Sequence, residues 1–112
     1  MPDDCLFCKI AAGEIPADVV RENDQTVAFR DINPQAPTHV LVIPRGHHKD
    51  VAELSRDSGL LAAVLREAAA VAEQEGLDAY RVVFNTGQDA GQTVFHVHAH
   101  VLGGRGMTWP PG

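Results

Sequence analysis

Residues 95–102, Phe-His-Val-His-Ala-His-Val-Leu, alternate apolar and imidazole side chains. Such alternation is typical of a β-strand, whose successive side chains point to opposite faces. We therefore expect His96, His98 and His100 on one face, about 6.5–7 Å between neighbours. A row of three imidazoles suits a core face poorly, because each ring has two nitrogens that need partners when buried. A single strand histidine is more often structural, but three in register predict a functional site.

The rest of the chain predicts an α+β fold, with an antiparallel sheet of about five strands, one long helix and one short N-terminal helix. The expected strands are residues 19–21, 26–30, 39–43, 80–85 and 94–102, and the expected helices are residues 5–12 and 57–75. A polar cluster predicts a hairpin turn at 22–25, and two prolines predict a loop at 31–37. Because most strands follow one another through turns, we expect the long helix to cover one face of the sheet.

The long helix has apolar residues at helical spacing, and we expect that stripe to pack on the sheet. The stripe consists of Leu60, Leu61, Val64, Leu65, Ala68, Val71 and Ala72, and the opposite face carries Arg66, Glu67, Glu73 and Gln74. Ser55 or Asp57 is suited to cap its start. Gly76 stands where a left-handed residue would end it.

Length and charge narrow the class of protein. The 112 residues predict a single domain over 1–112. Nine basic against 15 acidic residues give a net charge of −6, which argues against a nucleic-acid binder. The acidic start at residues 1–4 does not resemble a signal peptide, and no apolar run is long enough to cross a membrane. Two cysteines cannot form a disulfide framework, so we expect a cytoplasmic domain without membrane partners.

Two chemistries fit the row of histidines. Imidazole is a common metal ligand, and it is also a nucleophile and general acid or base near neutral pH. The glycine-containing loop at 86–92 directly precedes the row. Gly87, Gly91, Gln92 and Thr93 could offer backbone N–H groups and a hydroxyl to phosphate oxygens, although a plain hairpin connection would look the same. The position of this loop directly before three histidines favours a phosphate ligand.

Residues 96–102 resemble the signature of the histidine-triad (HIT) family, His-x-His-x-His followed by apolar residues. Segments 29–32, 34–39 and 42–44, and the terminal Trp-Pro-Pro-Gly at 109–112, look like the Hint branch of that family. The likeness runs nearly end to end. It implies a purine nucleoside phosphoramidase, an enzyme that hydrolyses AMP linked to an amine or lysine.

In the family, the middle histidine attacks the α-phosphorus and forms a nucleotidyl-histidine that water hydrolyses. The resemblance thus implies His98 as nucleophile, with His100, His39 and His96 as the other catalytic histidines. It implies an apolar base slot, a carboxylate on the ribose and contacts to the phosphate and leaving group. These nucleotide-binding residues would be Ile10, Phe29, Asp31, Ile32, Asn85, Gly91, Gln92, Thr93, His98, His100 and Trp109. The family more often has Ser where this chain has Thr93.

Cys5-x-x-Cys8 alone is a weak signal, but the chain also offers the pair His47-His48. Many bacterial members of the family bind zinc through two such cysteines, the histidine after Pro-x-x and the first triad histidine. The resemblance therefore implies one structural zinc on Cys5, Cys8, His47 and His96, with His48 as a solvated bystander. Such a zinc would tie the N-terminal helix to the triad strand and leave His98 free to react.

The C-terminal tail, residues 105–112, holds two prolines and one tryptophan. In the Hint branch this tail reaches the partner's active site, so we expect a homodimer with Trp109 near the leaving group.

Other functions remain open. The same fold could serve a nucleotidyl transferase or a dinucleoside-polyphosphate hydrolase. A non-catalytic nucleotide-binding or scaffold protein would not need the intact triad, and a purely structural zinc module would leave His39, His98 and His100 unexplained.

Overall fold

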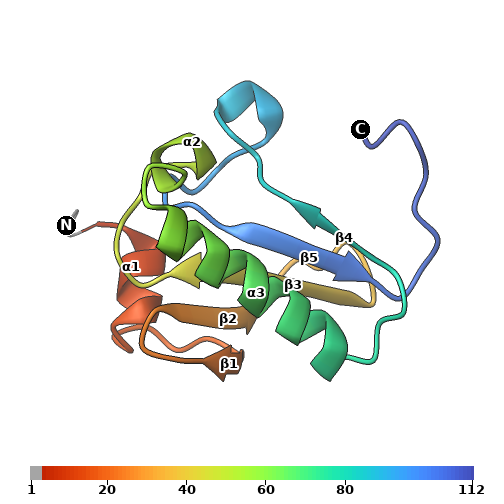
Figure 1. The fold of residues 1–112 in the computed structure, drawn as a ribbon, viewed down its shortest axis with the longest axis horizontal. Coiled ribbons are helices and arrows are strands. Elements are labelled where there is room, and N and C mark those ends of the chain that lie inside the picture. Colours follow the sequence, from red (N-terminus) through yellow and green to blue (C-terminus); the bar gives the residue numbers. More distant parts are fainter. Residues whose placement is uncertain (1–3) are drawn as a thin grey trace.

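The computed structural model describes residues 4–112, so the N-terminal residues 1–3 used in the signal-peptide argument lie outside it. A five-stranded antiparallel sheet in the order β1-β2-β3-β5-β4 forms its centre (Figure 1). The strands are β1 (Val19–Glu22), β2 (Thr26–Arg30), β3 (Thr38–Pro44), β4 (Tyr80–Val83) and β5 (Ala99–Gly103). The helices are α1 (Leu6–Ala11), α2 (Val51–Leu54), α3 (Ser58–Gln74) and the 3₁₀ turn η1 (Gln88–Ala90). Within residues 4–112 no helix is long and apolar enough to span a membrane.

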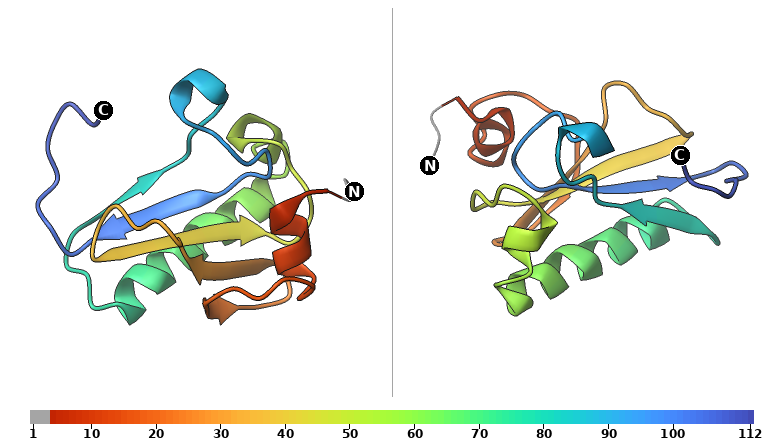
Figure 2. Two further views of the ribbon diagram at one scale, coloured as in Figure 1. Left: turned by 180° about the vertical axis from the view of Figure 1, so that it is seen from behind. Right: turned by 90° about the horizontal axis from the view of Figure 1, so that it is seen from above.

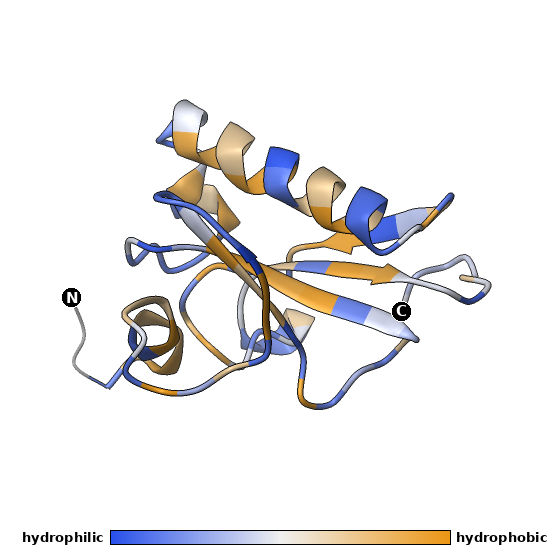
Figure 3. Ribbon diagram, turned by 90° about the horizontal axis from the view of Figure 1, so that it is seen from below, coloured by the Kyte–Doolittle hydropathy of each residue, from blue (hydrophilic) through white to orange (hydrophobic). Residues whose placement is uncertain are grey.

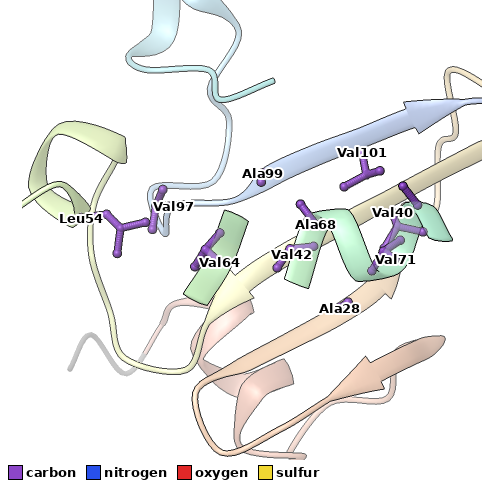
Figure 4. Close-up of a cluster of buried hydrophobic side chains, with 11 residues drawn as sticks. Ala28, Val40, Val42, Leu54, Val64, Ala68, Val71, Val97, Ala99 and Val101 are labelled. Carbon is purple, nitrogen blue, oxygen red and sulfur yellow. The ribbon is translucent and has the colours of Figure 1, made fainter. Parts of the chain in front are cut away.

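The two faces of the sheet carry different cores. The long helix α3 covers one face, and the short α1 lies on the other (Figure 2). On the α3 side, Val97, Ala99 and Val101 pack with valines of β3 against the helix (Figure 4). On the α1 side, Phe7 packs with Phe29. The expected α+β fold is confirmed, and the histidines of β3 and β5 are left on the α1 side.

Helix α3 begins where predicted, with Asp57 accepting a hydrogen bond from the backbone N–H of Leu60 at 3.0 Å. Gly76 follows its end with a φ of +71°, a conformation that glycine adopts without strain. Apolar residues of α3 face the sheet in Figure 3. One position on each predicted face is wrong: Leu65, expected on the apolar stripe, is 44% exposed, and Glu67, expected on the opposite face, is 5% exposed.

The burial of Glu67 has a clear cause, since its carboxylate takes donors from the β1–β2 hairpin. Arg21 donates from Nε, and Asn23 donates from Nδ2 at 2.9 Å. Thr26, which is fully buried, donates its hydroxyl at 3.4 Å. A buried carboxylate needs such partners, and one-dimensional helical spacing does not reveal them.

Some predicted bounds need correction. The last strand begins at Ala99, not at residue 94, because the preceding backbone bonds to the loop after β3: the N–H of Val97 donates to the carbonyl of His48 at 2.7 Å. Strand β4 ends at Val83, two residues early. The short helix α2 was not expected, and four residues are too few to show helical periodicity.

Candidate active site and metal centre

His98 and His100 line a cavity of about 640 Å³ on the α1 side of the sheet. His100 lies on β5 opposite Leu41 of β3, and His98 lies just before the strand, two residues away and on the same side. Their ring centroids are 4.9 Å apart. The other predicted residues that line this cavity are Ile10, Phe29, Asp31, Ile32, Gly91 and Thr93. Segments far apart in sequence therefore build one pocket with an apolar part and an imidazole part.

His98 presents an unprotonated nitrogen. Its Nδ1 lies 2.9 Å from the carbonyl oxygen of His96, which only accepts, so Nδ1 carries the proton and Nε2 carries the lone pair. Burial lowers the pKa of His98, which keeps the ring neutral at neutral pH. Phe7 packs edge-on against this ring, with centroids 5.1 Å apart. A neutral, oriented imidazole of this kind is a competent nucleophile.

His39 and His100 form a hydrogen-bonded pair whose proton positions can be read from their neighbours. The backbone N–H of Gln35 donates to His39 Nδ1 at 3.0 Å, so neutral His39 carries its proton on Nε2. His39 Nε2 lies 2.9 Å from His100 Nδ1, which therefore accepts. His100 then carries its proton on Nε2, a buried atom without a hydrogen-bond partner in the described part of the chain. Burial, with His98 and His39 nearby, lowers the pKa of His100 to about 4, so this donor is neutral.

Asp31 directly follows β2, lines the cavity and lies beside His39. Its Oδ1 accepts the backbone N–H of Asn33 at 2.8 Å, and its Oδ2 lies 3.4 Å from His39 Nε2. The side chain is 19% exposed, so the carboxylate remains open to a ligand in the cavity.

A second constellation, Cys5, Cys8, His47 and His96, has all four ligand atoms within 4.8 Å of one another. His96 Nδ1 lies 3.4 Å from both sulfurs, and His47 Nδ1 lies 3.4 Å from Cys8 Sγ. A tetrahedral zinc with ordinary Zn–S and Zn–N lengths would space sulfur and nitrogen by about 3.6 Å.

The surroundings of His96 agree with a metal site. His96 Nε2 donates to the carbonyl of Pro44 at 2.8 Å, which leaves the Nδ1 lone pair facing the sulfurs. The ring is fully buried, and it meets the His47 ring edge-on. Two thiols and two imidazoles form a closed structural zinc set, so this cluster is able to bind zinc.

Asp31, His39 and His100 also lie within ligand distance of one another, but their protons do not suit a metal. A metal on His39 Nε2 would require the proton on Nδ1, where the Gln35 N–H already points. The two clusters have similar spacing but differ in chemistry. The Cys/His cluster offers lone pairs to a metal, whereas Asp31, His39 and His100 are joined by hydrogen bonds.

Three of the predicted nucleotide-binding residues do not line this cavity in the single protomer. Gln92 is 2% exposed and serves the loop itself, accepting from the N–H of Gly87 and donating to the carbonyls of Lys49 and Val94. Asn85 and Trp109 do not line the cavity, and Trp109 is 83% exposed.

Sequence reasoning missed Phe7 and the Gln35 N–H. The three-residue spacing of Phe7 and Ile10 on α1 could have indicated a shared face, whereas a backbone N–H has no sequence signal.

Comparison with known proteins agrees with this geometry. The family model described as "HIT domain" matches residues 12–107. An uncharacterized HIT-like protein of Synechococcus elongatus is 50% identical over the whole of both chains, and a 14 kDa zinc-binding protein of Zea mays is 50% identical over 96% of this chain and 87% of that protein. The crystal structure of a HIT family hydrolase from Legionella pneumophila superposes with a TM-score of 0.94 at 55% identity, covering 97% of this chain and all of that chain.

Fold and site together define a histidine-triad protein with the fold of the HIT family hydrolases. The chain belongs to the HIT family, in agreement with the resemblance of residues 96–102.

Proposed function

We propose that this protein hydrolyses purine nucleoside 5′-phosphoramidates, AMP joined to an amine, through a covalent intermediate on His98. The observation that carries the proposal is the bond from His98 Nδ1 to the His96 carbonyl, because it leaves Nε2 unprotonated in a nucleotide-sized cavity. Structural relatives from Legionella pneumophila and Clostridium thermocellum bear the name HIT family hydrolase, which supports hydrolysis as the reaction class.

In the proposed reaction His98 Nε2 attacks the α-phosphorus, and the bond from phosphorus to the amine nitrogen breaks. The amine leaves with that electron pair and gains a proton from solvent. Water then attacks the phosphorus of the nucleotidyl-histidine, releasing AMP and restoring His98. His100 Nε2–H is a neutral donor fixed before the substrate arrives, and such donors stabilise charge that develops on phosphoryl oxygens.

The nucleoside would occupy the apolar part of the cavity. Ile10, Phe29 and Ile32 would flank the base, and Asp31 would accept hydrogen bonds from the ribose hydroxyls. A second hollow of about 470 Å³ shares Leu6, Thr93 and Val94 with the first, and it is also lined by Cys5 and His47 of the proposed zinc site. Arg30 also lines the cavity but is paired with Glu75 at 2.8 Å, so imidazole and backbone groups are left to hold the phosphate.

The decisive experiment traps the intermediate. The protein is mixed with adenosine phosphoramidate, quenched early and digested, and the peptide that contains residue 98 is examined for a nucleotidyl adduct by mass spectrometry. His98→Ala should abolish the adduct and turnover while AMP still binds. Full activity of that variant would refute the mechanism. Diadenosine polyphosphates, tested in parallel, distinguish the alternative hydrolase, and nucleotide binding without turnover of any substrate would indicate a scaffold.

We also propose one structural zinc per chain, bound by Cys5, Cys8, His47 and His96. Support comes from the fit of the four ligand atoms and from relatives in Zea mays and Brassica juncea named 14 kDa zinc-binding protein. The metal would cross-link α1 to the segment before β5, since the two cysteines and His96 come from opposite ends of the chain. It takes no part in the attack by His98.

The proposal includes a homodimer in which residues 105–112 reach the partner. The tail extends away from the sheet (Figure 1), and its Trp109 is largely exposed in the single protomer. An exposed tryptophan is a common anchor of protein interfaces. Light scattering at micromolar concentration should give the mass of a dimer, and a monomer would contradict this assembly.

A further inference from the structure

The loop at residues 31–37 lies beside the paired imidazoles of His39 and His100, and the backbone of Gln35 in this loop makes two hydrogen bonds, one through its N–H and one through its carbonyl. The N–H of Gln35 donates to His39 Nδ1 at 3.0 Å. The carbonyl of the same residue accepts from Arg105 Nε, also at 3.0 Å. Arg105 is thus connected to His100 by three successive hydrogen bonds through Gln35 and His39.

Arg105 reaches the loop because of the chain turn just after β5. Gly104 has a φ of +91°, and a Cβ at that position would lie 3.0 Å from Pro37 Cβ. Only glycine fits so close an approach at a positive φ. Arg105 also donates from Nη1 to the carbonyl of Gly106 at 3.0 Å, so its guanidinium is oriented by two carbonyls.

The direction of each bond matters for the cavity. Because His100 is neutral, a donor at its Nε2 requires that its Nδ1 remain an acceptor, which His39 Nε2–H ensures. His39 in turn donates from Nε2 when Gln35 donates to its Nδ1. If the Gln35 N–H turned away, His39 Nδ1 would lose its donor, and the proton on Nε2 would be favoured by the Asp31 carboxylate, 3.4 Å away, and by His100.

We propose that Arg105 and the backbone N–H of Gln35 are positioning groups that hold His39 and His100 in one hydrogen-bonded arrangement, with the His100 N–H presented to the cavity. Neither group reaches the substrate site, as neither lines the cavity. Both side chains are exposed, so their effect does not depend on packing in the core. Only the kinetic consequence rests on the proposed function.

The test observes the hydrogen bonds directly, without substrate. In uniformly ¹⁵N-labelled protein at neutral pH, nitrogen–nitrogen couplings across hydrogen bonds should connect Gln35 N with His39 Nδ1, and His39 Nε2 with His100 Nδ1. Arg105→Ala should weaken both couplings, and Arg105→Lys, which keeps one donor, should restore them in part. Unchanged couplings in Arg105→Ala, or a proton on His100 Nδ1 in the wild type, would overturn the proposal.

Arg81 provides a matched control, because it donates to the carbonyl of Thr108 at 2.9 Å and so also tethers the tail. Arg81→Ala should leave both couplings intact, whereas their loss there would mean that tail position, not the contact to Gln35, holds the pair. A second pair of variants isolates the backbone N–H of residue 35. Gln35→Ala keeps this N–H and should keep the couplings, whereas Gln35→Pro removes the donor and should lose the coupling between His39 and His100.

The kinetic readout follows with adenosine phosphoramidate. Arg105→Ala should lower kcat by roughly tenfold, as expected for a small misplacement of a catalytic donor, with KM nearly unchanged. A rise in KM alone would contradict a positioning role. If the wild type binds AMP and has the couplings but hydrolyses no phosphoramidate, the proposed function fails and the positioning inference stands.

Discussion

The Nδ1 of His98 donates to the backbone carbonyl of His96 across 2.9 Å, and this bond joins a histidine of the cavity to a residue of the Cys/His cluster. The His96 ring faces the two cysteines, and its carbonyl fixes the proton of His98, the proposed nucleophile. His96 therefore contributes its side chain to the metal cluster and its backbone carbonyl to the orientation of the His98 imidazole. A change among the side chains of the cluster should therefore affect His98 through the backbone of His96.

The zinc proposal predicts about one zinc per chain after mild purification. Cys8→Ser keeps nearly the same size but removes a thiolate, so we expect the variant to lose its zinc and to unfold at a lower temperature. A metal held at 1,000 times its Kd stabilises the folded state by about 4 kcal/mol. Elemental analysis and thermal unfolding measure both effects. His48→Ala, next to the cluster but outside it, should retain the metal, and a zinc-free wild type would disprove the site.

The buried Glu67 should contribute more to the free energy of unfolding than an exposed glutamate on the same helix. Glu67→Gln weakens the bonds from Arg21, Asn23 and Thr26, so the free energy of unfolding should fall by about 1–3 kcal/mol. Urea unfolding gives the value. Glu73→Gln on the exposed side of α3 is the matched control and should change stability by less than about 0.5 kcal/mol. Equal effects of the two substitutions would show that the hairpin contacts add nothing.

The low pKa of His100 predicts a specific pH dependence of stability. Its ordinary value of 6.5 applies to the unfolded chain and about 4 to the folded protein, so between these pH values the unfolded state binds more protons. Stability should therefore fall as the pH drops from 6.5 towards 4, by at most about 1.4 kcal/mol per pH unit for one proton.

His100→Asn removes this titration while other acid-sensitive groups remain. The unfolding free energies of wild type and His100→Asn are measured in urea at pH 7.5, 6 and 5. On acidification, the wild type should lose more unfolding free energy than the variant. A difference independent of pH would show that His100 titrates normally.

The ribose contact proposed for Asp31 predicts coupling between protein and substrate changes. Asp31→Asn should raise KM for the ribonucleotide by about 10- to 100-fold, the loss expected for hydrogen bonds to a charged group. A 2′-deoxy substrate lacks one of the hydroxyls concerned, so Asp31→Asn should raise KM for this substrate by a smaller factor than for the ribonucleotide. Steady-state kinetics on the four combinations measure this coupling, and fully additive effects would place the ribose elsewhere.

Local patterns predicted much of the fold because they reflect local physics. Alternation over residues 96–102 indicated which side chains share a face, and Asp57 and Gly76 marked the ends of α3 correctly. The errors arose where distant segments decided the outcome. Donors from the β1–β2 hairpin allow Glu67 to be buried. The Val97 N–H donates to the His48 carbonyl, so it is not available to pair with a neighbouring strand.

For the site, the alternating histidines and the family resemblance were sufficient to name His98 and the four candidate zinc ligands from the sequence alone. They were not sufficient to place Gln92, whose side chain is used inside its own loop. The tertiary structure alone decided where the protons lie: His96 Nε2–H points to Pro44, His98 Nδ1–H to His96, and His39 Nδ1 receives the N–H of Gln35. The physical reason is that an imidazole takes its tautomer from its partners, and all three of these partners are backbone groups, which no side-chain pattern encodes.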